Sequence, residues 1–209
     1  MAYQERGGAL ELKALVQDRG LCTGCGACAA LCPYIYAVLE KVAVIYPCGL
    51  GEGSCYRVCP RTPTDLAELD GAVFGKERAD HVLGEHSGIY FSRAKDGGVG
   101  GRGQYGGTVT ALLSFLLARG KIDAALAVRG SGAALPEPVV ASTKEDLLAC
   151  AGSKYSASPG LSLLSRAVRE GRRNLAVVGR PCQVTALRKI QRLAKEQSSP
   201  RLPLPGGGV

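Results

Sequence analysis

Four cysteines near the N-terminus carry the strongest chemical signal in the sequence. They follow the spacing C-x2-C-x2-C-x3-C-P, in which the residues are Cys22, Cys25, Cys28, Cys32 and Pro33. Bacterial iron–sulfur proteins use this spacing to bind a four-iron cluster, whereas zinc usually takes its four ligands as two separated pairs. The run therefore predicts a four-iron cluster rather than a zinc site.

A second run of cysteines repeats the end of the first run but not its beginning. It consists of Cys48, Cys55 and Cys59, and a full motif would also place cysteines at Gly49 and Glu52. In proteins with two such clusters, the fourth cysteine of each run binds the other cluster. This exchange predicts a first cysteine set of Cys22, Cys25, Cys28 and Cys59, and a second cysteine set of Cys32, Cys48 and Cys55.

The second cysteine set has three thiols, which leaves three alternatives. It binds a three-iron cluster, or it takes a fourth ligand from Cys150, Cys182 or Glu52, or it is degenerate and only one cluster forms. We expect the first set to bind one complete four-iron cluster, and the sequence leaves the second cluster open.

Composition and charge limit the class of protein. The chain has 209 residues and nine cysteines, an odd number that argues against a fully paired disulfide framework. The first 20 residues lack the apolar core of a signal peptide, and the apolar run 109–118 is too short to span a bilayer. We therefore expect a reduced, cytoplasmic protein.

The basic residues are concentrated near the C-terminus. The net charge is +8, and residues 151–209 hold 11 basic and 2 acidic residues, or +9. Aromatic residues are not interleaved with these charges, which disfavours nucleic acid as the ligand. The charge favours a solvated helix face, or a surface for an anionic cofactor or an acidic electron-transfer partner.

Expected strands and helices alternate along the rest of the chain, which indicates an α/β or α+β fold. Helices are expected over residues 9–16, 108–119, 143–151, 158–171 and 182–195, with one or two helical turns over 65–69 and Ser158 as an N-cap. Strands are expected over 89–93, 122–128, 139–141 and 175–178, short strands within 21–63, and loops over 97–107 and 136–138. The tail 197–209 is rich in Pro and Gly and is predicted to be disordered.

Three turns in the second half could hold a ligand. Residues 103–110 form a glycine loop that opens a helix, and such helix starts bind phosphate, although a plain glycine turn would give the same pattern. Residues 152–159 are either a polar binding loop or a capping loop. Cys182 starts a helix after a strand, where it is a nucleophile, a ligand or a small buried residue.

Taken in order, these segments resemble the family of coenzyme F420 hydrogenase/dehydrogenase beta subunits. The resemblance covers residues 20–192 and rests on the first cysteine run, CYRVCPR, GQYGGTVTALLSFLLARGKIDAALAV, AGSKYSASP and LAVVGRPCQVTALRKIQ. It implies an iron–sulfur flavoprotein oxidoreductase subunit, in which a ferredoxin-like module exchanges electrons with FAD. It also implies coenzyme F420, a chlorophyll derivative or another acceptor as the hydride-exchanging substrate.

The resemblance further implies which residues contact the flavin. These are Gly103, Gln104, Gly106, Gly107, Thr108, Thr110, Ser153, Lys154, Tyr155, Ser158, Pro181, Cys182 and Gln183. Two positions depart from the family pattern, because Tyr105 replaces the Ser of GQSGG and Arg180 replaces the Thr of GTPCQ. Both introduce larger side chains at turns that would shape the pocket.

The expected domain organisation begins with a short leading segment over residues 1–20 and the ferredoxin-like module over 21–63. A connecting segment over 64–95 then leads to the N-terminal part of an α/β flavin domain over 96–196, which is followed by the tail 197–209. Family members continue well past the GTPCQ helix, so the flavin domain is expected to be incomplete, as in a split subunit or a truncated chain. The expected partners are other subunits of a hydrogenase- or dehydrogenase-type complex. The alternatives are a relay subunit that holds clusters but no flavin, and an inactive fragment.

Overall fold

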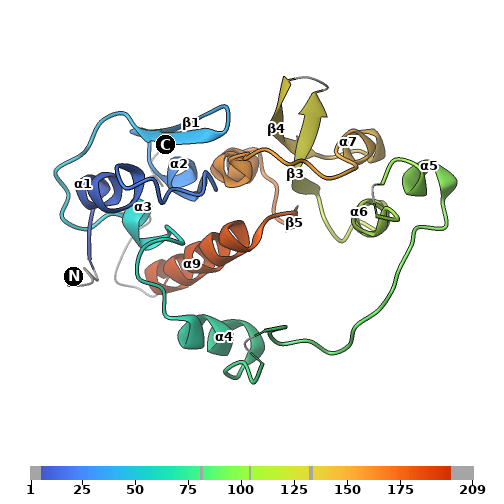
Figure 1. Cartoon of the computed structure of the whole chain (residues 1–209), viewed down its shortest axis with the longest axis horizontal. Coiled ribbons are helices and arrows are strands. Elements are labelled where there is room, and N and C mark those ends of the chain that lie inside the picture. The colour runs from blue at the N-terminus through green and yellow to red at the C-terminus, as the bar shows by residue number, and fades with distance from the viewer. Residues whose placement is uncertain (1–5, 81, 104, 132–133, 199–209) are drawn as a thin grey trace.

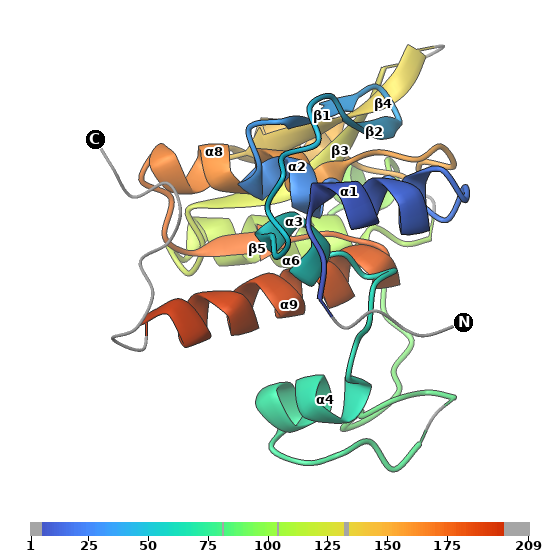
Figure 2. The ribbon, with the colours of Figure 1, turned by 90° about the vertical axis from the view of Figure 1, so that its left-hand side faces the viewer.

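The computed structural model describes residues 6–80, 82–103, 105–131 and 134–198 (Figure 1). A small cysteine-bearing module lies at one side and a three-stranded sheet with helices α6 and α7 lies at the other. The long helix α9 (Pro181–Ser198) contacts elements of both parts and runs along their underside (Figure 2). The predicted mixture of helices and strands is confirmed.

The cysteine-bearing module is built from short helices and one hairpin. Its elements are α1 (Ala9–Leu12), the π-helical turn η1 (Lys13–Gln17), α2 (Ala27–Leu31), β1 (Ile35–Val38), β2 (Lys41–Val44) and α3 (Ser54–Arg57). The strands pair antiparallel with Ile35 opposite Val44, so Ile35 and Val42 point to the buried side. Apolar residues of α1 and η1, among them Leu12 and Val16, close the core of this module.

The second module contains the sheet, in the order β4-β3-β5. Strand β3 pairs antiparallel with β4 and parallel with β5, whose link to β4 passes through α7, η2 and α8. Its elements are α5 (Gly97–Gly100), α6 (Thr108–Ala118), β3 (Ala124–Ser131), β4 (Ala134–Ala141), α7 (Lys144–Ala149), the 3₁₀ turn η2 (Gly160–Leu163), α8 (Leu164–Arg169) and β5 (Leu175–Val177). Leu113 and Leu147 pack on the buried face of β3 with Ala125.

One apolar cluster joins the two modules. Leu161 of η2 is fully buried and packs with Ala27 of α2, Val58 after α3 and Ala186 of α9. The amide of Leu161 donates a hydrogen bond to the carbonyl of Cys25 at 3.1 Å. Because four segments meet at this side chain, Leu161 fixes the cysteine module against the sheet module.

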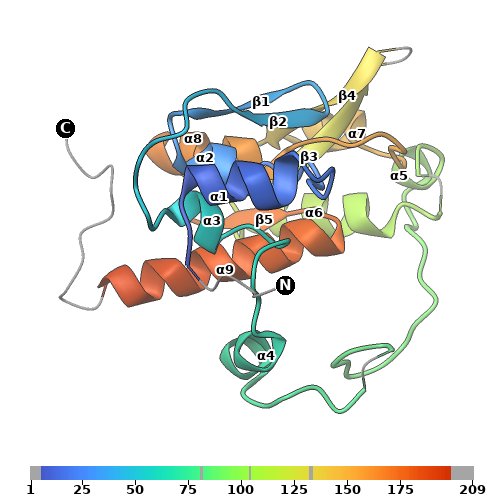
Figure 3. The same ribbon diagram turned by 60° about the vertical axis from the view of Figure 1, so that its left-hand side comes forward.

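The connecting segment departs from the body of the molecule. Helix α4 (Leu66–Phe74) is longer than the predicted turn, begins with Asp65 as its N-cap, and lies below α9 (Figure 3). It is attached through Arg192 of α9, which pairs with Glu68 at 2.5 Å. The chain then runs to α5 on the far side of the sheet module.

The strand predicted over residues 89–93 is absent. These residues have no regular structure, and the side chains of Ile89, Tyr90 and Phe91 are exposed. The aromatic and β-branched composition favours a strand only where a neighbouring strand supplies hydrogen bonds, and the described residues provide none here.

Three further predictions need correction. Pro136 and Pro138 lie inside β4 rather than in a loop, which is possible because β4 is an edge strand and needs no outward N–H. Ser158 does not cap a helix: the following turn is a 3₁₀ helix with Pro159 at its N-cap. Part of the loop predicted over 97–107 is also helical, as α5.

The other predicted elements are confirmed with small shifts. Helix α6 matches the prediction over 108–119, and Thr143 caps α7 through a hydrogen bond from the amide of Asp146. Helix α9 extends to Ser198, two residues into the segment predicted as a disordered tail. The remainder of that tail, residues 199–209, lies outside the described residues. In the described ranges, every helix is too short or too polar to cross a membrane.

We expect Leu161→Ala to lower the free energy of unfolding by about 2–5 kcal/mol, because the substitution leaves a cavity where the two modules meet. Leu112→Ala is the matched control, since Leu112 lies on the exposed face of α6; its effect should stay within about 0.5 kcal/mol. Denaturant unfolding monitored by circular dichroism measures both. Equal effects of the two substitutions would contradict the role assigned to Leu161.

Candidate functional site

The first cysteine run is wrapped around a left-handed turn. Gly26 has φ +87°, and a Cβ placed on it would lie 2.6 Å from the carbonyl oxygen of Pro159. Only glycine fits this position, because any side chain would collide with backbone that cannot move away. The turn starts α2 and places Cys25 and Cys28 at the interface between the modules.

The thiols of the first cysteine set share one electrostatic environment. The pKa of Cys25 is raised to about 11, mainly by burial and to a smaller extent by the charges of Cys59 and Cys182. Burial likewise raises the pKa of Cys28 well above its usual range, with added contributions from Cys25, Cys59 and Cys22. The structure therefore brings the four predicted ligands of the first set together.

The thiols of the second cysteine set also lie together. Burial raises the pKa of Cys55 to about 11, and Cys32 and Cys48 contribute in the same direction. Cys32 and Cys48 pack against the same apolar core as Cys55 and Cys28. The two sets are thus neighbours, and the exchange of the fourth cysteine between the runs matches the grouping of the thiols in space.

The three residues considered as a fourth ligand of the second set have other surroundings. Glu52 pairs with Arg6 at 3.0 Å on the surface. Cys182 lies beside Cys25 of the first set, and Cys150 lies at the end of α7 near Lys154. Cys150 and Cys182 therefore lie in surroundings other than those of the second cysteine set.

The donor chemistry of the first set fits an iron–sulfur cluster. Several buried thiols that raise one another's pKa are stable as thiolates only beside strong positive charge, which bound iron supplies. The amide of Arg61 already points at the sulfur of Cys59, with N and Sγ 3.5 Å apart. Among the described residues, no three His, Cys, Asp or Glu side chains converge closely enough for one metal ion.

A cavity of about 450 Å³ lies beside the cysteine module. It is enclosed by the start of α6, by β3, by α7 and by the two turns at residues 152–158 and 178–183. Its lining residues are Gly103, Tyr105, Gly107, Thr108, Val109, Thr110, Leu113, Ala127, Val128, Leu147, Cys150, Gly152, Ser153, Lys154, Ser156, Ser158, Val178, Gly179, Arg180 and Gln183. Its volume lies within the range of small-molecule and cofactor sites.

Most residues predicted to contact a cofactor line this cavity, although they come from three separate segments. They are Gly103, Gly107, Thr108, Thr110, Ser153, Lys154, Ser158 and Gln183. Four others do not line it: Gly106, Tyr155, Pro181 and Cys182. The side chain of Tyr155 is largely exposed, and Cys182 packs in the apolar cluster with Cys25. Gln104 lies outside the described residues.

Sequence reasoning missed the apolar floor of the cavity. Ala127 and Val128 of β3 and Leu147 of α7 form part of it, and their sequence signal is that of ordinary core residues. Tyr105 and Arg180, the two departures from the family pattern, both line the cavity. Val178 and Gly179 lie between a strand and the start of a helix. This position in the pattern could have identified them as residues of a binding site.

The polar groups of the cavity suit an elongated ligand with an anionic part. The side chain of Ser158 is buried, and within the described residues its hydroxyl has no hydrogen-bond partner. Gly107 is the N-cap of helix α6, has a left-handed backbone conformation and provides no side-chain cap. The first amides of α6 are therefore available to a ligand. The ammonium of Lys154 donates to the carbonyls of Ala151 and Gly152 at 2.7 and 2.8 Å.

The turn before α9 joins the cavity to the cysteine loop. The Arg180 guanidinium donates to the carbonyl of Thr23 at 2.8 Å, and Arg180 also lines the cavity. Gln183 accepts from the Arg180 amide at 2.8 Å and donates to the Ser158 carbonyl at 3.1 Å. The same few residues therefore form the wall of the cavity and the support of the first cysteine set.

Comparisons with known proteins match two separate parts of the chain. Residues 89–165 match the family model described as coenzyme F420 hydrogenase/dehydrogenase, beta subunit N-term, and residues 15–34 match a 4Fe-4S binding domain. A coenzyme F420-dependent sulfite reductase of Methanocaldococcus jannaschii is 36% identical over 84% of this chain and 26% of its own length. A coenzyme F420 hydrogenase subunit beta of Methanothermobacter thermautotrophicus is 42% identical over 53% of this chain and 40% of its own length.

Among solved structures, one of the F420-reducing [NiFe] hydrogenase complex from Methanosarcina barkeri matches 49% of this chain and 36% of the solved chain, with 38% identity and a TM-score of 0.47. The chain thus spans between about a quarter and two fifths of the curated relatives described above. The 4Fe-4S match at residues 15–34 falls within the cysteine-bearing module, and the match at residues 89–165 includes β3, β4 and α7 of the sheet-bearing module. Residues 89–165 of the chain therefore carry the N-terminal domain of coenzyme F420 hydrogenase/dehydrogenase beta subunits, and residues 15–34 carry a 4Fe-4S binding domain.

Proposed function

We propose that this chain is an electron-transfer subunit of an iron–sulfur flavoprotein oxidoreductase. In this proposal Cys22, Cys25, Cys28 and Cys59 hold a four-iron cluster, and the cavity holds FAD. The observation that carries the proposal is the shared wall: Arg180 lines the cavity and donates to the Thr23 carbonyl in the cysteine loop. A ligand in the cavity and a cluster in that loop would be separated by one layer of residues.

The chain's own residues would bind and orient the flavin. The free amides at the start of α6 and the nearby Lys154 suit the diphosphate, and the hydroxyl of Ser158 offers a buried hydrogen bond. Val128 and Leu147 give an apolar floor that excludes water. Bound flavin supplies the conversion between two-electron hydride transfer and single-electron transfer.

Coenzyme F420 or a related hydride carrier is the proposed substrate class. The names of the two relatives described above both refer to coenzyme F420. The proposed partners are other subunits of a hydrogenase- or dehydrogenase-type complex, since a further relative is one of the subunits of the F(420)H(2) dehydrogenase of Methanosarcina mazei. We place the chain in the cytoplasm, because its proposed chemistry requires reduced thiols.

We expect the anaerobically purified chain to contain about four iron and four sulfide ions if the first cysteine set alone is loaded. Seven or eight iron ions would show that the second cysteine set also binds a cluster. Cys28→Ala should lose most of the iron of the first set, because Cys28 lies at the centre of that set. Cys150→Ala is the control and should retain the iron, since Cys150 lies near Lys154 instead. A soluble, folded chain without iron would contradict the proposal.

We expect Ser158→Ala to weaken FAD binding about tenfold, which corresponds to the loss of one hydrogen bond of about 1.4 kcal/mol. Without FAD, the same substitution should leave stability unchanged or raise it, because a buried hydroxyl without a partner costs about 1–3 kcal/mol. Ser162→Ala is the control, since Ser162 is not among the cavity-lining residues. Fluorescence titration with FAD and thermal unfolding measure the two effects.

The same titration separates the two function classes. A wild-type chain that holds iron but binds no FAD would be a relay subunit with clusters and no flavin. Weakened FAD binding in Ser158→Ala together with lower stability of the ligand-free protein would instead indicate a structural role for Ser158.

A further inference from the structure

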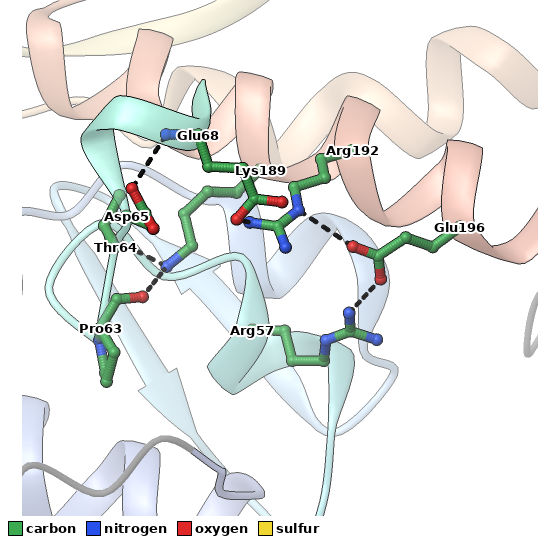
Figure 4. Close-up of polar contacts among 8 residues, drawn as sticks. All are labelled: Arg57, Pro63, Thr64, Asp65, Glu68, Lys189, Arg192 and Glu196. Carbon is green, nitrogen blue, oxygen red and sulfur yellow. Dashed lines mark hydrogen bonds and ion pairs between the residues drawn. The ribbon is translucent and has the colours of Figure 1, made fainter. Parts of the chain in front are cut away.

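Helix α9 directs one ammonium group into the chain segment that follows the second cysteine run. The Nζ atom of Lys189 donates to the Cys59 carbonyl at 2.7 Å. It donates to the Pro63 carbonyl at 3.0 Å as well (Figure 4). It also donates to the hydroxyls of Thr62 and Thr64 at 3.2 and 3.1 Å. The side chain is half-buried, and all four of its partners are uncharged.

Two carboxylates on this side of α9, those of Glu68 and Glu196, are paired with arginines instead, whereas the Asp65 carboxylate accepts from the amide of Glu68 at 2.9 Å. Arg192 pairs with Glu68 at 2.5 Å and with Glu196 at 3.0 Å, and Glu196 also binds Arg57 (Figure 4). Within the described residues Lys189 forms no ion pair, whereas Arg192, less than one turn along the helix, forms two. The charge of Lys189 is therefore held by dipoles and is not cancelled by a carboxylate.

This charge lies beside a residue of the first cysteine set. The Lys189 ammonium nitrogen lies 2.7 Å from the carbonyl oxygen of Cys59, so its charge is held next to that member of the set. Charges interact more strongly in a protein interior than in water, because the effective dielectric constant there is lower. A cation held at this point therefore stabilises any additional negative charge on the first set.

We propose that Lys189 is a positioning residue that raises the reduction potential of the cluster bound by the first cysteine set. Its hydrogen bonds fasten residues 59–64 to α9, and its uncancelled charge favours the form of the cluster that carries one more electron. The reduction takes up one electron from an external donor, with no bond made or broken and no proton transferred. The inference rests on the proposed function only in assigning Cys59 as a ligand.

The test is a potentiometric titration of the full-length, cluster-loaded chain, with dithionite as reductant and electron paramagnetic resonance of the reduced cluster as readout. We expect Lys189→Gln to shift the midpoint to more negative potential, so that the ratio of reduced to oxidised cluster falls about tenfold at a fixed solution potential, or about 59 mV for one electron. Lys189→Arg keeps the charge and should stay close to wild type. Lys195→Gln removes an exposed charge from the same helix and should also stay close to wild type.

A second pair of variants tests the charge without removing Lys189. Thr64→Asp places a carboxylate beside the ammonium and should lower the reduction potential of the cluster. Thr64→Asn introduces an uncharged side chain of the same shape as Asp and should leave the potential unchanged. This pair decides the question if Lys189→Gln does not fold. Wild-type potentials in both Lys189→Gln and Thr64→Asp, with clusters present, would overturn the proposal. A wild-type chain that binds no iron would overturn the proposed function instead, so the two failures are distinguishable.

Discussion

The contact between the first cysteine loop and the turn η2 determines the position of every other part of the site. Gly26 lies so close to the Pro159 carbonyl that no side chain fits, and the Leu161 amide binds the Cys25 carbonyl. Because these are backbone contacts, they fix the loop more rigidly than side-chain packing would. Ser158, which precedes η2, and Gly160, the first residue of η2, meet Gln183 at the wall of the cavity. The close contact between the first cysteine loop and η2 therefore sets the distance between the cysteine sets and the cavity.

The cysteine module has short elements and thiols in its core. Its helices are four or five residues long, its strands have four residues each, and three of its nine buried core residues are cysteines. Burial and mutual repulsion raise the pKa of Cys25, Cys28 and Cys55, which makes the thiolate forms unfavourable without bound metal. Metal binding and folding of this module are consequently coupled, as in other small domains whose metal sites occupy the core. Helix α9 adds support from outside through Lys189, which binds carbonyls and hydroxyls on residues 59–64.

Features that depend on the spacing of residues along the chain are predicted better from the sequence than features that depend on which segments pack together. The cysteine spacing gives the grouping of Cys55 with Cys32 and Cys48, and the glycine loop and polar loop do line one cavity. The strand predicted over 89–93 is wrong, because its composition is strand-like but no neighbouring strand is present in the described residues. The prolines of β4 break the local rule because the strand lies at an edge. Lys189 carries no local signal at all, since its role arises only when α9 packs against a segment about 125 residues earlier in the chain.

The concentration of basic residues near the C-terminus has a different explanation from the one that composition suggests. A run of unpaired charges on the faces of helices would favour an acidic partner, but several of these residues have partners within the chain. Arg166 pairs with Glu170, Arg192 with Glu68 and Glu196, and Arg180 with a backbone carbonyl. Lys189 has its charge directed inward, toward Cys59. Much of the positive charge of α9 therefore holds the cysteine module and α4 in place. Net charge reports only the sum over a surface, whereas the contacts of Lys189 place one cation of that sum against the Cys59 carbonyl.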